Sequence, residues 1–319
     1  MKKVLCVLLL SLSLLFVSCG EKNVLAEITI VGNDNTEQTH LIQTTDDPVQ
    51  VKEALQLLNQ VVPESNFSGV SMQLEARIDG NLTVTDQEVR TIDLGYDLSL
   101  DAQMNLRDYR MNGKFELNGS TKTDSNSLTL DSKQNLKADF TNDDSFIYCD
   151  IAANLDVLRG TLKAKEDITE FTNSYKALIV SFLDLYKYYK LGAIISDIDS
   201  FVEDYKVSIS KTTKESFTLD IHIPSSLIDQ SLNMQEDLVI QIEISCKKVL
   251  PVAITFNADE FIQELLEKEY VEKYISSEVD VKSASLRFNI KLEYGKYTIK
   301  ELPEEEKEIY VEYSLSGII

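Results

Sequence analysis

Residues 69–79 read GVSMQLEARID, and the alternation within this short stretch decides the fold class. Every second residue is apolar, and polar residues occupy the positions between them. The apolar residues are Val70, Met72, Leu74, Ala76 and Ile78. A period of two residues is typical of a β-strand with one buried and one solvated face. We therefore expect an antiparallel sheet with a dry face and a wet face.

The same alternation recurs further along the chain and predicts a meander of strands. Its phase slips between Leu106 and Tyr109, which predicts a turn or bulge near Arg107-Asp108. Asp79-Gly80-Asn81 is a hairpin signal and predicts a turn at that point. The expected strands are 92–100, 109–117, 128–130, 136–140, 147–151, 206–210, 217–223, 238–246, 252–257 and 284–294, with an edge strand at 309–315.

Helical periodicity interrupts the strands. Asp47 is an N-cap followed by Pro48 at the first helical position, and apolar residues then follow at helical spacing until Pro63. Residues 169–190 have a broad apolar stripe of period 3.6, and further helices are expected at 194–202 and 259–276. The simplest fold class is α+β: a large, curved, mostly antiparallel sheet (an unclosed half-barrel) with helices packed on its dry, concave face. A division into two domains near Leu158–Asp167 is the main alternative.

The N-terminus has the features of a secretory signal peptide. Lys2 and Lys3 precede a mostly apolar run that ends at Val17 and is too short for a comfortable bilayer span. The end of this run and the cysteine after it, Phe16-Val17-Ser18-Cys19, resemble the lipobox of bacterial lipoproteins. The resemblance implies that residues 1–18 are removed and that diacylglycerol modifies Cys19. The mature protein would then be anchored outside the bacterial cytoplasm, at the cell surface or in the periplasm.

Two interpretations of the chain around Cys19 stay open: a lipoprotein, or an ordinary secreted protein cleaved after Ser18 with an incidental cysteine. Residues 19–47 are polar and aperiodic, and we expect a lipidated N-terminus and flexible tether there, with an edge strand at 27–31. Residues 48–319 then form a single α+β half-barrel domain.

Composition excludes nucleic acid as a partner and leaves open whether two cysteines form a disulfide. Removal of Lys2 and Lys3 leaves 29 basic residues against 53 acidic ones, a net charge of −24. Nucleic-acid binding depends on basic patches, so it is excluded. Of the four cysteines, Cys149 and Cys246 lie in the mature domain. They form either a disulfide or two separate buried thiols.

Catalytic motifs are absent from the sequence. The chain has two histidines, His40 and His222, and neither has a Ser or Cys partner at a recognisable spacing. There is no HExxH, CxxC, P-loop or GxGxxG motif. We therefore expect no catalytic residues, no metal site and no cofactor. Paired carboxylates, as in glycosidases, are the one catalytic arrangement that counting residues leaves open.

The order of the expected elements is similar to one known family. An amphipathic helix, a long antiparallel meander, a helical insertion and further strands resemble the LolA/LolB lipoprotein-carrier fold and its lipidated relatives of the LppX/LprG type, over Val49–Tyr297. The stretch VLPVAITFNAD (249–259) looks like a later hairpin of that family, whereas the acidic C-terminal segment departs from its compact form. The resemblance implies an unclosed barrel plugged by helices, with acyl chains held between sheet and plug.

On this interpretation the protein binds or carries a lipid or another apolar molecule, and the membrane is a further partner through the anchor. The expected sheet wall is Val70, Met72, Leu74, Ile92, Leu94, Tyr96 and Leu98. The expected plug is Phe171, Tyr175, Leu178, Ile179 and Phe182. One alternative is a surface structural or interaction lipoprotein with a filled core and no ligand. Another is a hydrolase that uses acidic residues.

Overall fold

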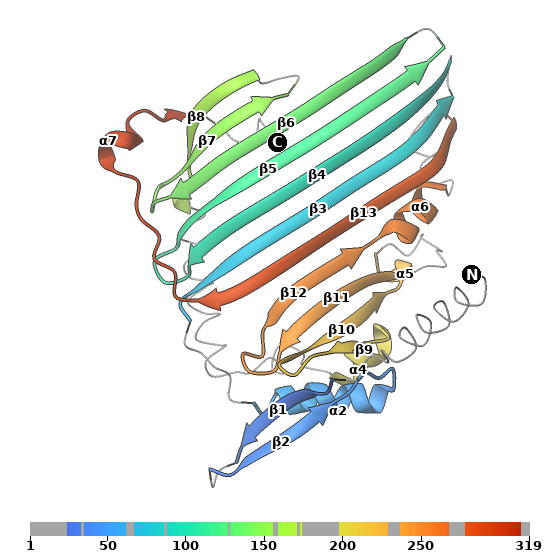
Figure 1. Ribbon diagram of the computed structural model, residues 1–319, viewed down its shortest axis with the longest axis vertical. Coiled ribbons are helices and arrows are strands. Elements are labelled where there is room, and N and C mark those ends of the chain that lie inside the picture. Colours follow the sequence, from blue (N-terminus) through green and yellow to red (C-terminus); the bar gives the residue numbers. More distant parts are fainter. Residues whose placement is uncertain are drawn as a thin grey trace, which may run out of the picture.

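A computed structural model describes residues 24–32, 35–61, 67–85, 88–126, 128–155, 159–170, 173, 198–228, 237–267 and 278–313. Its main feature is an open sheet of twelve strands in the order β14-β8-β7-β6-β5-β4-β3-β13-β12-β11-β10-β9 (Figure 1). Neighbouring strands are antiparallel except for β14 and β8, which are parallel. The expectation of a large, mostly antiparallel, unclosed sheet is therefore confirmed.

One half of the sheet is a meander of consecutive strands. These are β3 (Gly69–Thr85), β4 (Val89–Asn105), β5 (Arg110–Ser125), β6 (Thr129–Asn142), β7 (Phe146–Asn154) and β8 (Arg159–Asp167). The turn predicted near Arg107-Asp108 is confirmed, since β4 ends at Asn105 and β5 begins at Arg110. The division considered near Leu158–Asp167 falls on β8, which is an inner strand of this sheet.

The turn predicted at Asp79-Gly80-Asn81 is wrong. Strand β3 runs through these residues and continues to Thr85. Gly80 lies directly opposite Leu94, and a Cβ on Gly80 would be 3.3 Å from Leu94 Cγ. The glycine therefore makes room for a neighbouring side chain within the sheet and does not turn the chain.

The other half of the sheet is joined to the meander by a long-range pairing. β13 (Glu278–Gly295) pairs along its whole length with β3. The strands that follow outward are β12 (Pro251–Asn257), β11 (Leu238–Ser245), β10 (Ser216–Ile223) and β9 (Ser208–Thr212). Two segments about 200 residues apart in the chain thus form the centre of the sheet.

The described helices lie near the β9 edge and around the ends of the strands, as Figure 1 shows. They are α2 (Pro48–Leu58), α4 (Ile198–Asp204), α5 (Ser225–Ile228), α6 (Asp259–Glu267) and α7 (Glu304–Lys307). Asp47 caps α2 as expected, because the Val49 N–H donates to Asp47 Oδ1 at 2.9 Å. No helix among these described segments is long and apolar enough to cross a membrane. The expected helix 169–190 lies almost entirely outside the described residues.

Part of the expected flexible tether is folded. β1 (Ala26–Val31) and β2 (Glu37–Ile42) form an antiparallel hairpin. Ala26 and Ile28 are completely buried, in the same cluster as Val51 of α2 and Phe217 of β10. Because these side chains complete a core shared with α2, α4 and the β9–β10 edge, burial of apolar surface holds the hairpin on the domain.

Two separate cores contain the two cysteines. Cys246 lies in the cluster under the hairpin, and Cys149 lies with Leu136 and Ile151 under β6 and β7. Both are free thiols, and burial raises the pKa of each to about 11. Of the two alternatives for this pair, the structure has two separate buried thiols.

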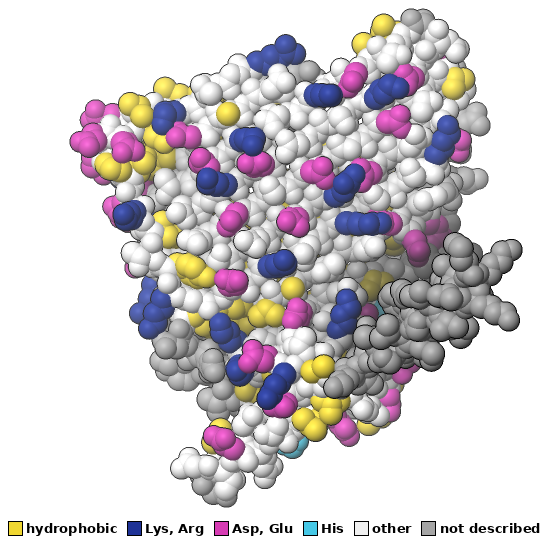
Figure 2. Space-filling view, viewed as in Figure 1, with side chains coloured by type: hydrophobic (Ala, Val, Ile, Leu, Met, Phe, Trp, Pro, Cys, Tyr) yellow, Lys and Arg dark blue, Asp and Glu magenta, His cyan; other side chains and the backbone are white. Residues whose placement is uncertain are grey.

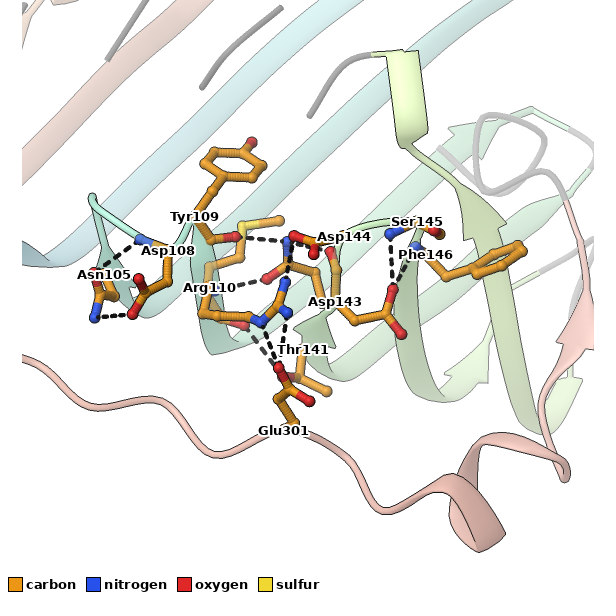
Figure 3. A network of polar contacts seen from close by, with 12 residues as sticks. Asn105, Asp108, Tyr109, Arg110, Thr141, Asp143, Asp144, Ser145, Phe146 and Glu301 are labelled. Carbon is orange, nitrogen blue, oxygen red and sulfur yellow. Dashed lines mark hydrogen bonds and ion pairs between the residues drawn. The ribbon is translucent and has the colours of Figure 1, made fainter. Parts of the chain in front are cut away.

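The C-terminal strap, residues 296–313, joins β13 to the opposite half of the sheet. Arg110 pairs with Glu301 of the strap at 2.7 Å and with Asp144 of the β6–β7 turn at 2.9 Å (Figure 3). Further along, Lys307 pairs with Asp143 at 3.0 Å. The strap ends as β14 (Val311–Glu312) beside β8, so the expected edge pairing near residue 309 is confirmed over these two residues.

Candidate ligand-binding face

Strand registers align apolar side chains into rows across the sheet. Residues opposite each other in antiparallel strands project to the same face, so successive pairings define a continuous row. One row extends from β10 to β8. Its members are Leu219, Ile242, Ile254, Ile290, Leu74, Leu100, Phe115, Ala138, Ile151 and Leu162. We call the face that contains this row the dry face.

A second apolar row lies beside the first. Its members are Ile221, Ile240, Phe256, Phe288, Ala76, Leu98, Leu117, Leu136 and Ala153. Where β12 meets β13, the Phe256 and Phe288 rings stack with their centroids 4.6 Å apart. Together the two rows form an apolar surface across at least nine strands, which an isolated domain in water has to cover or use.

Coverage of the dry face is uneven. Toward the two edges some of its side chains are buried, for example Ile151 on β7 and Leu219 on β10, whereas Leu162 and Ile221 are partly exposed. In the centre, Leu74 on β3 and Leu100 on β4 remain partly exposed, and Ile78 is 46% exposed. Among the described residues, the central strands therefore have apolar side chains that remain partly exposed.

The seven wall residues expected from the sequence all lie on this central part. Val70, Met72 and Leu74 project from the first half of β3. Ile92, Leu94, Tyr96 and Leu98 project from the first half of β4, which is opposite the second half of β3. The structure thus places the two groups on the same face but near opposite ends of the strand pair.

The pairing of β13 with β3 adds residues to the apolar wall that the sequence did not predict there. Leu286, Phe288, Ile290 and Leu292 of β13 lie next to β3 on the dry face. Their alternation indicated a strand, but no local signal indicated which strand would be its neighbour. The expected plug residues Phe171, Tyr175, Leu178, Ile179 and Phe182, and the expected lipidation site Cys19, lie outside the described residues.

The opposite, wet face is a surface of paired charges. Arg77 pairs with Asp79 at 2.6 Å and lies 3.9 Å from Asp97 on the neighbouring strand. Lys137 pairs with Glu116 across β5 and β6 at 3.1 Å. Figure 2 shows this face, with dark blue and magenta side chains alternating over the sheet. These groups are largely exposed, so each pair contributes little to stability but keeps the face soluble.

Two open hollows lie on the wet face. One, of about 570 Å³, spans β12 to β5 and is lined by residues that include Arg77, Asn118 and Arg287. The other, of about 600 Å³, spans β5 to β8 between Lys114 and Lys163. Both have paired charges at their rims, and neither contains a histidine or a cysteine. Their chemistry is that of a solvated surface.

Metal chemistry finds no support in the described part of the chain, where no group of three or more His, Cys, Asp or Glu residues is placed to hold an ion. No protein-family model matches the sequence, and no curated protein matches it significantly. The candidate ligand-binding surface is the dry face, with its partly exposed centre on β3 and β4.

Proposed function

We propose that the protein is a membrane-anchored extracytoplasmic lipoprotein that binds or carries a lipid or another apolar ligand on the dry face. The observation that supports this proposal is the continuous apolar surface of that face, whose members on β3 and β4 are all at least partly exposed whereas buried members occur only toward the edges. The lipobox-like Phe16-Val17-Ser18-Cys19 supports the anchor, with Cys19 as the lipidated residue. No catalytic step or cofactor is part of the proposal.

The strength of binding would come from burial of apolar surface. Each methylene that leaves water contributes roughly 0.8 kcal/mol, so two acyl chains suffice for tight binding. Leu74, Leu98 and Leu100 would contact the chains, because they belong to the apolar rows and keep partial exposure. The buried members toward the edges, Leu219, Leu136 and Ile151, would contribute rigidity.

The proposal includes helices on the concave side of the sheet. The helix expected at 169–190 would close over the centre of the dry face, and its apolar stripe, which includes Phe171, Tyr175, Leu178, Ile179 and Phe182, would form the roof. The ligand would then lie between sheet and roof.

Native mass spectrometry of protein purified without detergent, combined with uptake of a fluorescent fatty acid, tests this function. We expect bound lipid or probe uptake in the wild type, and at least tenfold weaker uptake after Leu74→Gln or Leu100→Gln. The matched controls are Gln73→Ala and Ser99→Ala, which change neighbouring positions on the wet face and should bind as the wild type does. An apo mass together with no uptake contradicts the proposal.

That contradictory result would favour the alternative of a surface structural or interaction lipoprotein. The two hollows on the wet face are the observation in its favour, because they offer shaped polar surface of about 570 and 600 Å³ to a partner.

A further inference from the structure

The dry face changes character at one corner. Toward the β3–β4 hairpin it stays apolar on those two strands, with Leu82 opposite Ile92 and Gly80 opposite Leu94. On β5 and β6, these two rows and the neighbouring row of Ile78 and Tyr96 contain four polar side chains, although the Leu82–Ile92 row ends on the exposed Leu130 of β6. The polar side chains are Thr121, Thr123, Ser132 and Gln134. The two apolar rows through Leu74 and Ala76 stay apolar from β3 to β7, so the polar corner departs from the pattern of the rows beside it.

Registers confirm that the corner belongs to the dry face. Thr121 lies between Leu94 on β4 and Ser132 on β6, and Thr123 lies between Ile92 and Leu130. Thr121, Thr123, Ser132 and Gln134 are all partly exposed. A ligand on the dry face would therefore meet hydroxyl and amide groups directly beside the apolar wall.

Tyr96 forms the boundary between the apolar and polar parts. Its ring lies over Gly119 of β5, where a Cβ would come within 2.3 Å of ring carbons. Its hydroxyl is 2.9 Å from Thr121 Oγ1. The glycine thus lets the aromatic ring lie flat across the neighbouring strand, with its apolar body toward the wall and its hydroxyl in the polar corner.

The corner itself is uncharged. On the dry face of β3 to β6, the nearest charged side chain in the described residues is Arg90, one row further toward the hairpin, and it already has a contact of its own. Neutral hydroxyl and amide groups satisfy a polar ligand by hydrogen bonding, but they compensate poorly for the desolvation of a charge.

We infer that the dry face selects amphiphiles with an uncharged, hydroxyl-bearing head, which hydrogen-bonds to Thr121, Thr123, Ser132 and Gln134 while the acyl part lies on the β3–β4 wall. This inference rests on the proposed function, because it requires the apolar part of the ligand to bind first.

The experiment measures displacement of a fluorescent acyl probe from the full-length mature protein by three competitors of equal chain length. They are a monoacylglycerol, a fatty acid and a fatty acid methyl ester. We expect the monoacylglycerol to compete best, and the double substitution Thr123→Val with Ser132→Ala to reduce its advantage over the methyl ester about threefold to tenfold per lost hydrogen bond. Ser120→Ala, on the wet face of β5, is the matched control and should leave the preference unchanged.

Four results overturn the inference. If all three competitors bind equally to the wild type, the dry face binds acyl chains without discriminating between their head groups. The proposed function is then kept and the inference is wrong. A preference for the fatty acid that is lost in Arg90→Gln would mean that the head is anionic. If nothing displaces the probe because no probe binds, the proposed function itself fails. Retention of the monoacylglycerol preference in the double variant likewise contradicts the assignment of these residues.

Discussion

Asp143 connects the C-terminal strap to the β6–β7 turn. Its carboxylate accepts hydrogen bonds from the Ser145 and Phe146 N–H groups, both at 2.8 Å, and from the Tyr148 hydroxyl at 2.8 Å. It also pairs with Lys307 of the strap, and both side chains are less than one fifth exposed. Burial alone would raise the pKa of Asp143, but these donors together lower it to about 2.

This lowered pKa predicts a pH-dependent contribution to stability. The carboxyl group has an ordinary pKa of 3.8, so its contribution is complete above about pH 5 and is lost as the pH falls through 3.8 toward 2. We expect Asp143→Asn to lower the free energy of unfolding by about 1–2 kcal/mol at pH 7. The difference from the wild type should shrink as the pH approaches 2, as urea unfolding at several pH values would measure.

A control for this prediction is Asp139→Asn on the wet face. Asp139 is 4.0 Å from Lys114, and both side chains are more than two thirds exposed, so little change is expected at any pH. Equal stability of the wild type and Asp143→Asn at pH 7 would contradict the role assigned to Asp143.

At the scale of elements, the β1–β2 hairpin shows how a short polar segment becomes part of a core. Within AEITIV (Ala26–Val31), two side chains of one parity are completely buried, whereas Val31 of the other parity is 45% exposed. Helix α2 supplies Val51, Leu55 and Leu58 to the same cluster. The hairpin is therefore an integral layer of the domain over the β9–β10 edge.

Truncation of a buried hairpin side chain should destabilise the whole domain. We expect Ile28→Ala to lower the free energy of unfolding by about 2–4 kcal/mol, because it removes methyl groups from a filled site. Val31→Ala should cost less than about 1 kcal/mol, since that side chain is already exposed. Chemical denaturation of the two variants compares them directly, and equal, negligible effects would mean that this segment acts as a linker.

At the scale of the whole molecule, the sheet separates two hydrophobic cores near its opposite edges. Cys149 belongs to the core under β6–β8, and Cys246 belongs to the core under β9–β11 and the hairpin. Both thiols are almost inaccessible, and burial raises their pKa to about 11. Each cysteine therefore behaves as a small apolar core residue.

This separation predicts two free and slowly reacting thiols. At pH 8 an alkylating reagent should label neither Cys149 nor Cys246 quickly in the native protein, because thiolate is scarce and access is blocked. Both should react promptly in denaturant without a reducing agent, as intact-mass measurement would show. A peptide that links the two cysteines in a non-reducing digest would contradict the arrangement.

Much of the fold was predictable from local pattern because a solvated sheet imposes a period of two on every strand. Most strands of the meander, the turn before Tyr109 and the cap at Asp47 followed from such signals. Strand β8 was not expected, and β6 is one strand where two, at 128–130 and 136–140, were expected. The prediction of a turn at Asp79-Gly80-Asn81 was wrong, because the local sequence does not distinguish a glycine that makes room for Leu94 from a glycine in a turn. The expected edge strand at 27–31 is β1, but its partner β2 was missed because its sequence, EQTHLI, has no alternating apolar pattern.

The sequence by itself determined which side chains of each predicted strand share a face, and hence that long strands such as β3, β4, β5 and β13 have a dry side. Only the tertiary structure decided that β13 lies beside β3, that the dry rows cross from one half of the chain to the other, and that a polar corner adjoins the wall. The physical reason is that alternation is a property of one strand and its solvent. Strand neighbours depend on pairing between segments about 200 residues apart, which no local pattern records.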